Sequence, residues 1–330
     1  MNMELGFDLA AAAPSPTPPA PQPAEPAADK PRIWTVFVTW FVTALVGQMV
    51  VIAMFLVAAA AIALVLVAQG ADPGSLQPRI TAVLTQPVLA LILSIVPFQL
   101  TMLLAVVLVA QKSTTPFRER VGLLSPQGRP FSRLTLAGLA ACTLSLALAI
   151  AIGMSLLIGF PGGHHVGGKV SDGSWLGLTV LAVVLSLLPA VVEEIFFRGY
   201  IQRRLLQRWS PAAAIAVSTT LFAVLHFDSL HHILSVIPLG VVTGWLAYRT
   251  NSVKPGMVVH AIHNAGAMAF AGVAKVLVPA LGNEGAGWVM ITLIAALAVA
   301  SLPALVALWQ RDNVAGAIPT PTLSQSALAT

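Results

Sequence analysis

Apolar residues run in long stretches along this chain, and the charged residues fall almost entirely between those stretches. An apolar stretch of about 20 residues is long enough to cross a lipid bilayer as an α-helix. The stretches are apolar on every side, whereas the strands of a membrane barrel would alternate polar and apolar residues. We therefore expect an all-α, polytopic membrane bundle of about eight transmembrane helices. The pattern predicts them near residues 34–69, 82–111, 134–160, 175–197, 211–227, 232–248, 255–274 and 287–309.

The first stretch, residues 34–69, is long enough for two interpretations. A tight hairpin around Gly47 and Gln48 would give two spans, whereas one long, tilted helix would give a single span. We favour the single helix, because an extra span would reverse the distribution of positive charge for everything downstream.

Segments of different composition flank the apolar part of the chain. Residues 1–31 are rich in Ala and Pro and cannot bury a core, so we expect a disordered N-terminal tail. The membrane-embedded helical domain is expected over residues 32–310, with its polar motifs concentrated in residues 175–275. Residues 311–330 are predicted to form a polar C-terminal tail.

Composition agrees with a membrane location. Only 9% of the residues are charged and 57% are hydrophobic, whereas about 25% of the residues of a soluble domain are charged. The net charge of +5 does not indicate nucleic-acid binding, because the Lys and Arg residues are dispersed between apolar stretches. Cys142 is the only cysteine, which excludes an intramolecular disulfide and a thiolate metal cage.

The positive residues predict how the helices are oriented. If eight helices alternate from a cytoplasmic N-terminus, 14 of the 17 Lys and Arg residues fall in the inside segments. Only Arg79, Lys169 and Lys275 then fall outside. Because positive residues concentrate on the cytoplasmic side of membrane proteins, we expect a multi-pass protein of the cell inner membrane with both termini in the cytoplasm.

The first group of polar residues lies at the end of the apolar stretch that begins at Trp175. Ionisable residues in or beside a membrane span are costly, so their presence suggests function. On a helix, Glu194 and Arg198 share a face and can form an ion pair. Glu193 points about 100° away and does not share Arg198 as a partner. Burial can therefore make its carboxylate a stronger base. Pro189 is predicted to kink the helix just before the pair.

Two further groups follow along the chain. Phe222 and His226 share a helix face, with the His at the end of a short span. His260 and Asn264 lie one helical turn apart, with His263 beside them. Two hydrogen-bond donors at that spacing can point at one oxygen atom, as an oxyanion hole requires.

Each group has an ordinary structural explanation when it is taken alone. A Glu and Arg cluster at the end of a span is often interfacial, and a lone His or a His–Asn pair commonly holds two helices together. His164, His165, His231 and His232 lie in predicted connections, where we expect them to be solvated.

Together and in this order, the three groups resemble the CPBP family of intramembrane proteases, which includes the eukaryotic CAAX prenyl endopeptidases and many bacterial Abi-type proteins. The family pattern is E-E-x-x-x-R, then F-x-x-x-H, then H-x-x-x-N, on successive core helices. The resemblance covers about residues 175–275 and implies hydrolysis of a peptide bond within the membrane. The matching residues are Glu193, Glu194 and Arg198, then Phe222 and His226, then His260 and Asn264.

The resemblance also implies a role for each group. Glu193 would activate the attacking water with help from His226. Glu194 and Arg198 would order that base. The His and Asn of the third group would stabilise the tetrahedral oxyanion. A base, a residue that orients it and two donors are sufficient for amide hydrolysis.

The resemblance leaves the need for a metal open, because the family has been described both as metalloproteases and as metal-free, glutamate-dependent enzymes. Glu193, His226 and His260 could supply a zinc site with an open position for water. No motif spacing in the sequence demands a metal. We favour catalysis without a cofactor, with zinc as the alternative.

Two other functions stay open at this point. The same ionisable residues could form the path of a proton-coupled carrier or channel, or the protein could be non-catalytic, as in bacteriocin immunity. We favour the protease, because a proton path has no use for a His and an Asn one turn apart beside a carboxylate pair. The expected partners are the lipid bilayer and a membrane-associated or lipid-modified protein or peptide substrate, not nucleic acid. The sequence carries no feature that fixes an oligomeric state.

Overall fold

The computed structural model describes residues 32–111, 115–128, 130–159 and 174–314. Within these ranges every regular element is a helix, so the helical membrane bundle expected from the sequence is confirmed. The predicted N-terminal tail and residues 315–330 of the C-terminal tail lie outside the described residues.

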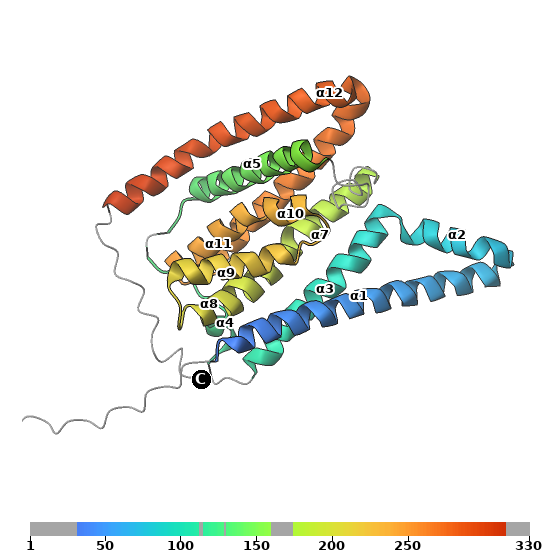
Figure 1. Cartoon of the computed structure of the whole chain (residues 1–330), viewed down its shortest axis with the longest axis horizontal. Helices are drawn as coiled ribbons and strands as arrows, with labels where there is room; N and C mark the ends of the chain where they lie inside the picture. The colour runs from blue at the N-terminus through green and yellow to red at the C-terminus, as the bar shows by residue number, and fades with distance from the viewer. Residues whose placement is uncertain (1–31, 112–114, 129, 160–173, 315–330) are drawn as a thin grey trace, which may run out of the picture.

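The chain is a succession of helices (Figure 1). The first part of the chain contains α1 (Trp34–Ala68), α2 (Pro73–Leu84), α3 (Pro87–Ala110), α4 (Phe117–Arg120) and α5 (Arg133–Ile158). The second part contains α7 (Trp175–Glu193), the π-helix η1 (Glu194–Gln202), α8 (Arg203–Leu205), α9 (Pro211–Val224), α10 (Leu230–Ser235), α11 (Ile237–Thr250) and α12 (Lys254–Val314).

The starts of the helices are set by their local sequence. The side chains of Ser132, Ser174, Ser210 and Ser229 each accept a hydrogen bond from a backbone N–H in the first turn of the following helix. Such caps satisfy donors that have no partner inside the helix. Proline stands in the first turn of α2, α3 and α9, where its missing N–H costs nothing.

Most predicted spans correspond to these helices, with one change of boundary in the first half. The first stretch is a single 35-residue helix, which confirms the preference for one helix over a hairpin. The stretch predicted from residue 82 does not begin there, because Gln86 has an extended ψ of 125° before Pro87. The residue before a proline disfavours the helical region, so α2 and α3 are separate helices.

The number of spans is not confirmed as eight. Six helices are long and apolar enough to cross a membrane, among the described residues. The shorter α9 has 14 residues, fewer than a typical span requires. The last two predicted spans lie in one element, α12, which is interrupted at Gly282, a residue with a φ of 70° and non-helical geometry.

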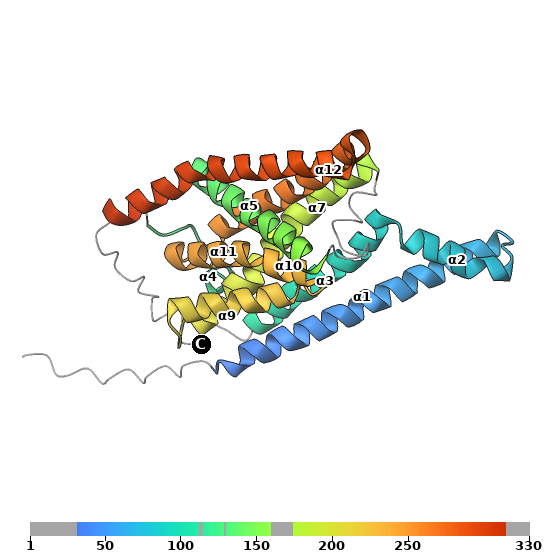
Figure 2. The ribbon, with the colours of Figure 1, turned by 45° about the horizontal axis from the view of Figure 1, so that its top comes forward.

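Burial is concentrated around η1, in the middle of the bundle. All nine residues of η1 are buried, whereas the 35 residues of α1 include only five that are buried. Figures 1 and 2 show α1 with α3 along one side and α5 with the end of α12 along the other. The outer helices expose large apolar side chains, as expected for surfaces that face lipid.

The pairing of α5 with α12 depends on a small residue at their crossing. A Cβ atom added at Gly138 of α5 would overlap the Cβ atom of Ala304 of α12. Gly153, on the same helix, has no atom within 4 Å of an added Cβ. The two glycines therefore offer a matched test of close helix packing.

We predict that Gly138→Ala destabilises the protein, because α5 and α12 must move apart or distort. Overpacking of this kind costs about 1 to 3 kcal/mol. Gly153→Ala should be neutral or stabilising by up to about 1 kcal/mol, since Gly is a poor helix residue. Thermal unfolding in detergent micelles measures both variants, and equal melting temperatures would contradict the packing described for these helices.

Candidate active site

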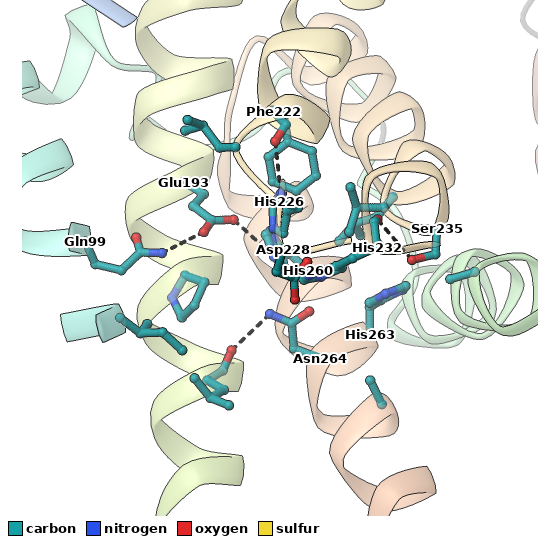
Figure 3. Close-up of a pocket in the computed structure, with 18 of the residues that line it drawn as sticks. Gln99, Glu193, Phe222, His226, Asp228, His232, Ser235, His260, His263 and Asn264 are labelled. Carbon is teal, nitrogen blue, oxygen red and sulfur yellow. Dashed lines mark hydrogen bonds and ion pairs between the residues drawn. The ribbon is translucent and has the colours of Figure 1, made fainter. Parts of the chain in front are cut away.

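Glu193 is the last residue of α7, and its carboxylate lies between two polar side chains from other helices. Its Oε1 atom accepts a hydrogen bond of 2.6 Å from Nε2 of Gln99 on α3. Its Oε2 atom lies 3.7 Å from Nε2 of His260 on α12. Figure 3 shows the carboxylate between Gln99 on one side and the imidazoles on the other. The Glu193 side chain is 10% exposed, so its carboxylate is held almost entirely by protein atoms.

Glu194 begins the π-helix and turns to a different set of partners. Its Oε1 atom lies 3.3 Å from Nη1 of Arg198, so the ion pair expected between these residues is present. The same oxygen lies 3.0 Å from Nδ1 of His260. Glu194 and Arg198 are 0% and 1% exposed. The charge of Glu194 is therefore compensated entirely inside the protein.

Arg198 has two further contacts that fix its guanidinium. Nη2 donates a hydrogen bond of 3.0 Å to the carbonyl oxygen of Gly240 on α11. The guanidinium carbon lies 4.6 Å from the centroid of the Phe222 ring, in cation–π contact. Arg198 thus ties η1 to α9 and α11.

His260 connects the two carboxylates. Its Nδ1 atom faces Glu194 and its Nε2 atom faces Glu193, so one imidazole from α12 contacts both neighbouring acids. Because an ionised carboxylate only accepts hydrogen bonds, Nδ1 is the protonated nitrogen when the ring is neutral. The two adjacent acids therefore have different surroundings, as their helix positions predict: Glu194 is paired with Arg198, and Glu193 receives a neutral amide.

His226 lies just after the end of α9, on the wall opposite Glu193. Its Nδ1 atom lies 2.9 Å from the carbonyl oxygen of Phe222. A carbonyl can only accept, so Nδ1 carries the proton and Nε2 keeps its lone pair in the neutral ring. The His226 ring stands edge-on to the rings of Phe222 and His232, with centroids 4.8 and 4.7 Å away.

Asn264 lies one turn after His260 on α12, as its spacing predicts. Its Nδ2 atom donates a hydrogen bond of 3.0 Å to the carbonyl oxygen of Leu185 on α7. In this structure the amide therefore holds α12 against α7. The shared oxyanion contact of His260 and Asn264 stays a prediction.

A cavity of about 520 Å³ joins these groups. Four of the six predicted site residues line it: Glu193, His226, His260 and Asn264. Glu194 and Arg198 do not line the cavity and lie behind its wall. The other walls come largely from apolar residues of α1, α3, α5 and α12. The structure thus separates the residues that can reach a substrate from those that support them.

The structure also adds residues that the sequence did not single out. The only sequence signal for Gln99 is its amide side chain within an apolar stretch.

His232 was expected to be solvated, but it also lines the cavity, and its Nδ1 atom lies 2.7 Å from Asp228 Oδ1. His231 was also expected in solvent, but it is 8% exposed and its Nε2 donates to the Gly159 carbonyl at 3.0 Å. The His232 side chain is 35% exposed, so it is partly solvated as expected. The expectation for His231 is wrong because residues 230–235 form α10, which packs against α5.

His263 is a further buried imidazole on the cavity wall. It is 6% exposed, and its Nδ1 atom lies 3.0 Å from the hydroxyl of Thr143 on α5. The hydroxyl also lies 3.0 Å from the carbonyl oxygen of Ala140, to which it can only donate. His263 therefore contributes to the contact between α5 and α12. His164 and His165 lie outside the described residues.

The candidate zinc ligands were tested against this geometry. Among the described residues, no group of three or more His, Cys, Asp or Glu side chains is arranged to hold a metal ion. His260 directs Nδ1 at Glu194, and in the neutral ring its Nε2 atom keeps a lone pair 3.7 Å from Glu193 Oε2. Catalysis without a cofactor, with zinc as the alternative, stays a prediction, and no step proposed below passes through a metal.

We predict that Arg198→Met destabilises the protein by about 3 to 5 kcal/mol, because the charge of Glu194 is left buried without its partner. The double variant Glu194→Gln with Arg198→Met should recover a large part of this loss, since both charges are removed. Thermal unfolding in detergent gives the comparison, with the exposed Arg118→Met on α4 as the control. If the single and double variants lost the same stability, the buried pair would not be coupled.

Comparison with known proteins gives one match. Residues 175–266 match the family model described as type II CAAX prenyl endopeptidase, Rce1-like. No curated protein and no solved structure matches the chain. The matched segment contains all three polar groups, and the family is one of proteases, which supports a membrane-bound endopeptidase. The resemblance of this chain to the CPBP family of membrane proteases is therefore confirmed over the segment that carries its motifs.

Proposed function

We propose that this protein is an intramembrane endopeptidase in which Glu193 activates a water molecule for attack on a peptide bond. The observation that carries the proposal is the position of the Glu193 carboxylate. It lies on the wall of a largely apolar cavity, with His226, His260 and Asn264 on the same cavity. A base, an imidazole and two possible donors around one cavity are the groups that amide hydrolysis needs.

The reaction begins with proton transfer to Glu193. Its Oε2 atom has no hydrogen bond within the described residues, so a lone pair is free to take a proton from water. The water oxygen bonds to the peptide carbonyl carbon, and the carbonyl oxygen takes the negative charge. His226 assists through its unprotonated Nε2 atom, which can accept a hydrogen bond from the same water.

The developing oxyanion is stabilised by the third group. Asn264 uses one N–H on the Leu185 carbonyl and has a second N–H available, since an amide carries two donors. In its doubly protonated form, His260 can donate from Nε2 while Nδ1 stays on Glu194. The C–N bond then breaks, the proton held by Glu193 passes to the leaving nitrogen, and the products are a carboxylic acid and an amine.

The substrate is proposed to be the peptide of a membrane-associated or lipid-modified protein. The cavity lies among helices that are apolar enough to span a membrane, and apolar residues form most of its wall. A lipid-modified peptide can bury its apolar part there and place a peptide bond beside the carboxylate. The matched family is described as type II CAAX prenyl endopeptidase, so a prenylated CAAX peptide is the first probe to use.

We predict that Glu193→Gln abolishes cleavage of a quenched, prenylated CAAX peptide by the protein purified in detergent. The substitution keeps the size of the side chain but removes the carboxylate lone pair that accepts the proton of water. Loss of a catalytic base lowers kcat by a factor on the order of 10² to 10⁴. The measurement is the initial rate of fluorescence release.

The same preparation supplies the controls. Thermal unfolding should give similar melting temperatures for wild type and Glu193→Gln, so that loss of activity is not loss of fold. A membrane proteome incubated with both proteins extends the search to other substrates. Equal cleavage by the two proteins would refute the protease and leave the carrier and binding functions.

We propose catalysis without a metal, so chelation should leave the wild-type rate unchanged.

The orientation in the membrane is proposed from the distribution of positive charge. We predict that topology reporters fused after Lys112 and after Gly163 report opposite sides of the inner membrane, with the first in the cytoplasm. The α5 helix of 26 residues separates the two points and is long enough to cross. Alkaline phosphatase and a fluorescent protein provide complementary reporters. Reports from the same side at both points would contradict this topology.

A further inference from the structure

Gln99 is a buried polar residue far in sequence from the matched segment. It lies in the middle of α3, is 3% exposed and lines the cavity. An amide in an apolar helix is costly unless its hydrogen bonds are satisfied. The hydrogen bond of Gln99 goes to Glu193, at 2.6 Å.

The chemistry of the two groups fixes which amide atom faces Glu193. An ionised carboxylate has only acceptors, so Gln99 must present an N–H and not its oxygen. The amide oxygen, Oε1, accepts no hydrogen bond within the described residues. No competing contact therefore holds the amide in the opposite orientation, and Glu193 alone determines it.

We propose that Gln99 is a positioning residue that orients Glu193 for proton transfer, a role that rests on the function proposed above. By occupying Oε1, the amide leaves Oε2 as the basic atom. Oε2 is the oxygen that lies 3.7 Å from His260 Nε2, on the side of the carboxylate turned towards the imidazoles (Figure 3). Gln99 thus selects which of two otherwise equivalent oxygens takes the proton.

The neutrality of Gln99 is part of this role. Glu194 is paired with the guanidinium of Arg198, so a positive charge already lies beside that acid. A Lys or Arg in place of Gln99 would form such an ion pair with Glu193 and make it a weaker base. The Gln99 amide orients the Glu193 carboxylate through one hydrogen bond and places no positive charge beside it.

The test compares two substitutions of similar size, Gln99→Met and Gln99→Glu, in the full-length protein purified in detergent. The probe is the prenylated CAAX peptide used for Glu193→Gln. Gln99→Met removes the donor, and we expect kcat to fall about 10- to 100-fold with KM nearly unchanged, as for a misoriented catalytic group. Thr101→Val on the same helix is the matched control, because the Thr101 hydroxyl donates only to the carbonyl of Pro97 in its own helix.

Gln99→Glu gives a signature that a structural role would not produce. The introduced carboxyl group can donate to Glu193 only while it carries a proton, so activity should approach wild type at acidic pH and fall as that proton is lost. The other ionisable groups near Glu193 are His260, Glu194 and Arg198, and His226, Asp228, His232 and His263 line the same cavity; all are unchanged in all variants. Any alkaline loss caused by those shared groups appears in every variant, so an additional alkaline loss should appear in Gln99→Glu and be absent from Gln99→Met and wild type.

The outcomes separate this inference from the proposed function. If Glu193→Gln retains activity, the protease itself is refuted. If Glu193→Gln is inactive but Gln99→Met has wild-type kcat, the positioning role of Gln99 is refuted and the protease stands. A fall in melting temperature for Gln99→Met, with kcat per folded molecule unchanged, would also overturn the role.

Discussion

The buried contact of Glu194 with Arg198 and His260 is the interaction on which the rest of the structure depends. Charged side chains inside a lipid-facing bundle are tolerated only when their charge is compensated by partners of good geometry. Here a carboxylate of η1 meets a guanidinium from the same π-helix and an imidazole from α12. The guanidinium also bonds to Gly240 of α11. Three segments of the chain, η1, α11 and α12, are thus fixed around one charged centre, and the cavity lies beside it.

Close packing of helices allows this centre to exist without voids. A Cβ atom added at Gly256 of α12 would lie 2.9 Å from Glu194 Oε2, and one at Gly244 of α11 would lie 2.8 Å from Gln202 Oε1. Gly199 of η1 would come within 2.6 Å of the Val121 carbonyl oxygen. Small residues let helix backbones approach and bring polar groups within reach of one another. The glycines of α11 and α12 therefore contribute to the site because they have no side chain that would push these polar groups away.

The sequence predicts the fold better than it predicts the contacts of the site. Apolar runs identify the helices because a bilayer demands about 20 apolar residues, but length alone does not show that α9 is short or that α12 bends at Gly282. The pairing of Glu194 with Arg198 follows from helical spacing, whereas the contact of Gln99 with Glu193 joins residues 94 positions apart. No periodicity encodes such a contact. It depends on how α3 packs against α7, and that packing is a tertiary property.

The π-helix includes one of two neighbouring acids that have different surroundings. It begins at Glu194, directly after the α-helix that ends with Glu193, and π-helical turns are frequent at functional sites. Glu194 points towards Arg198, behind the cavity wall, and Glu193 lies on the wall itself. One acid therefore balances charge in the interior, while the other faces a neutral amide and an imidazole. Neighbouring residues of a helix point about 100° apart, so this one helix boundary can place a charge-balancing acid in the interior and a second acid on the cavity wall, where the proposed base has to lie.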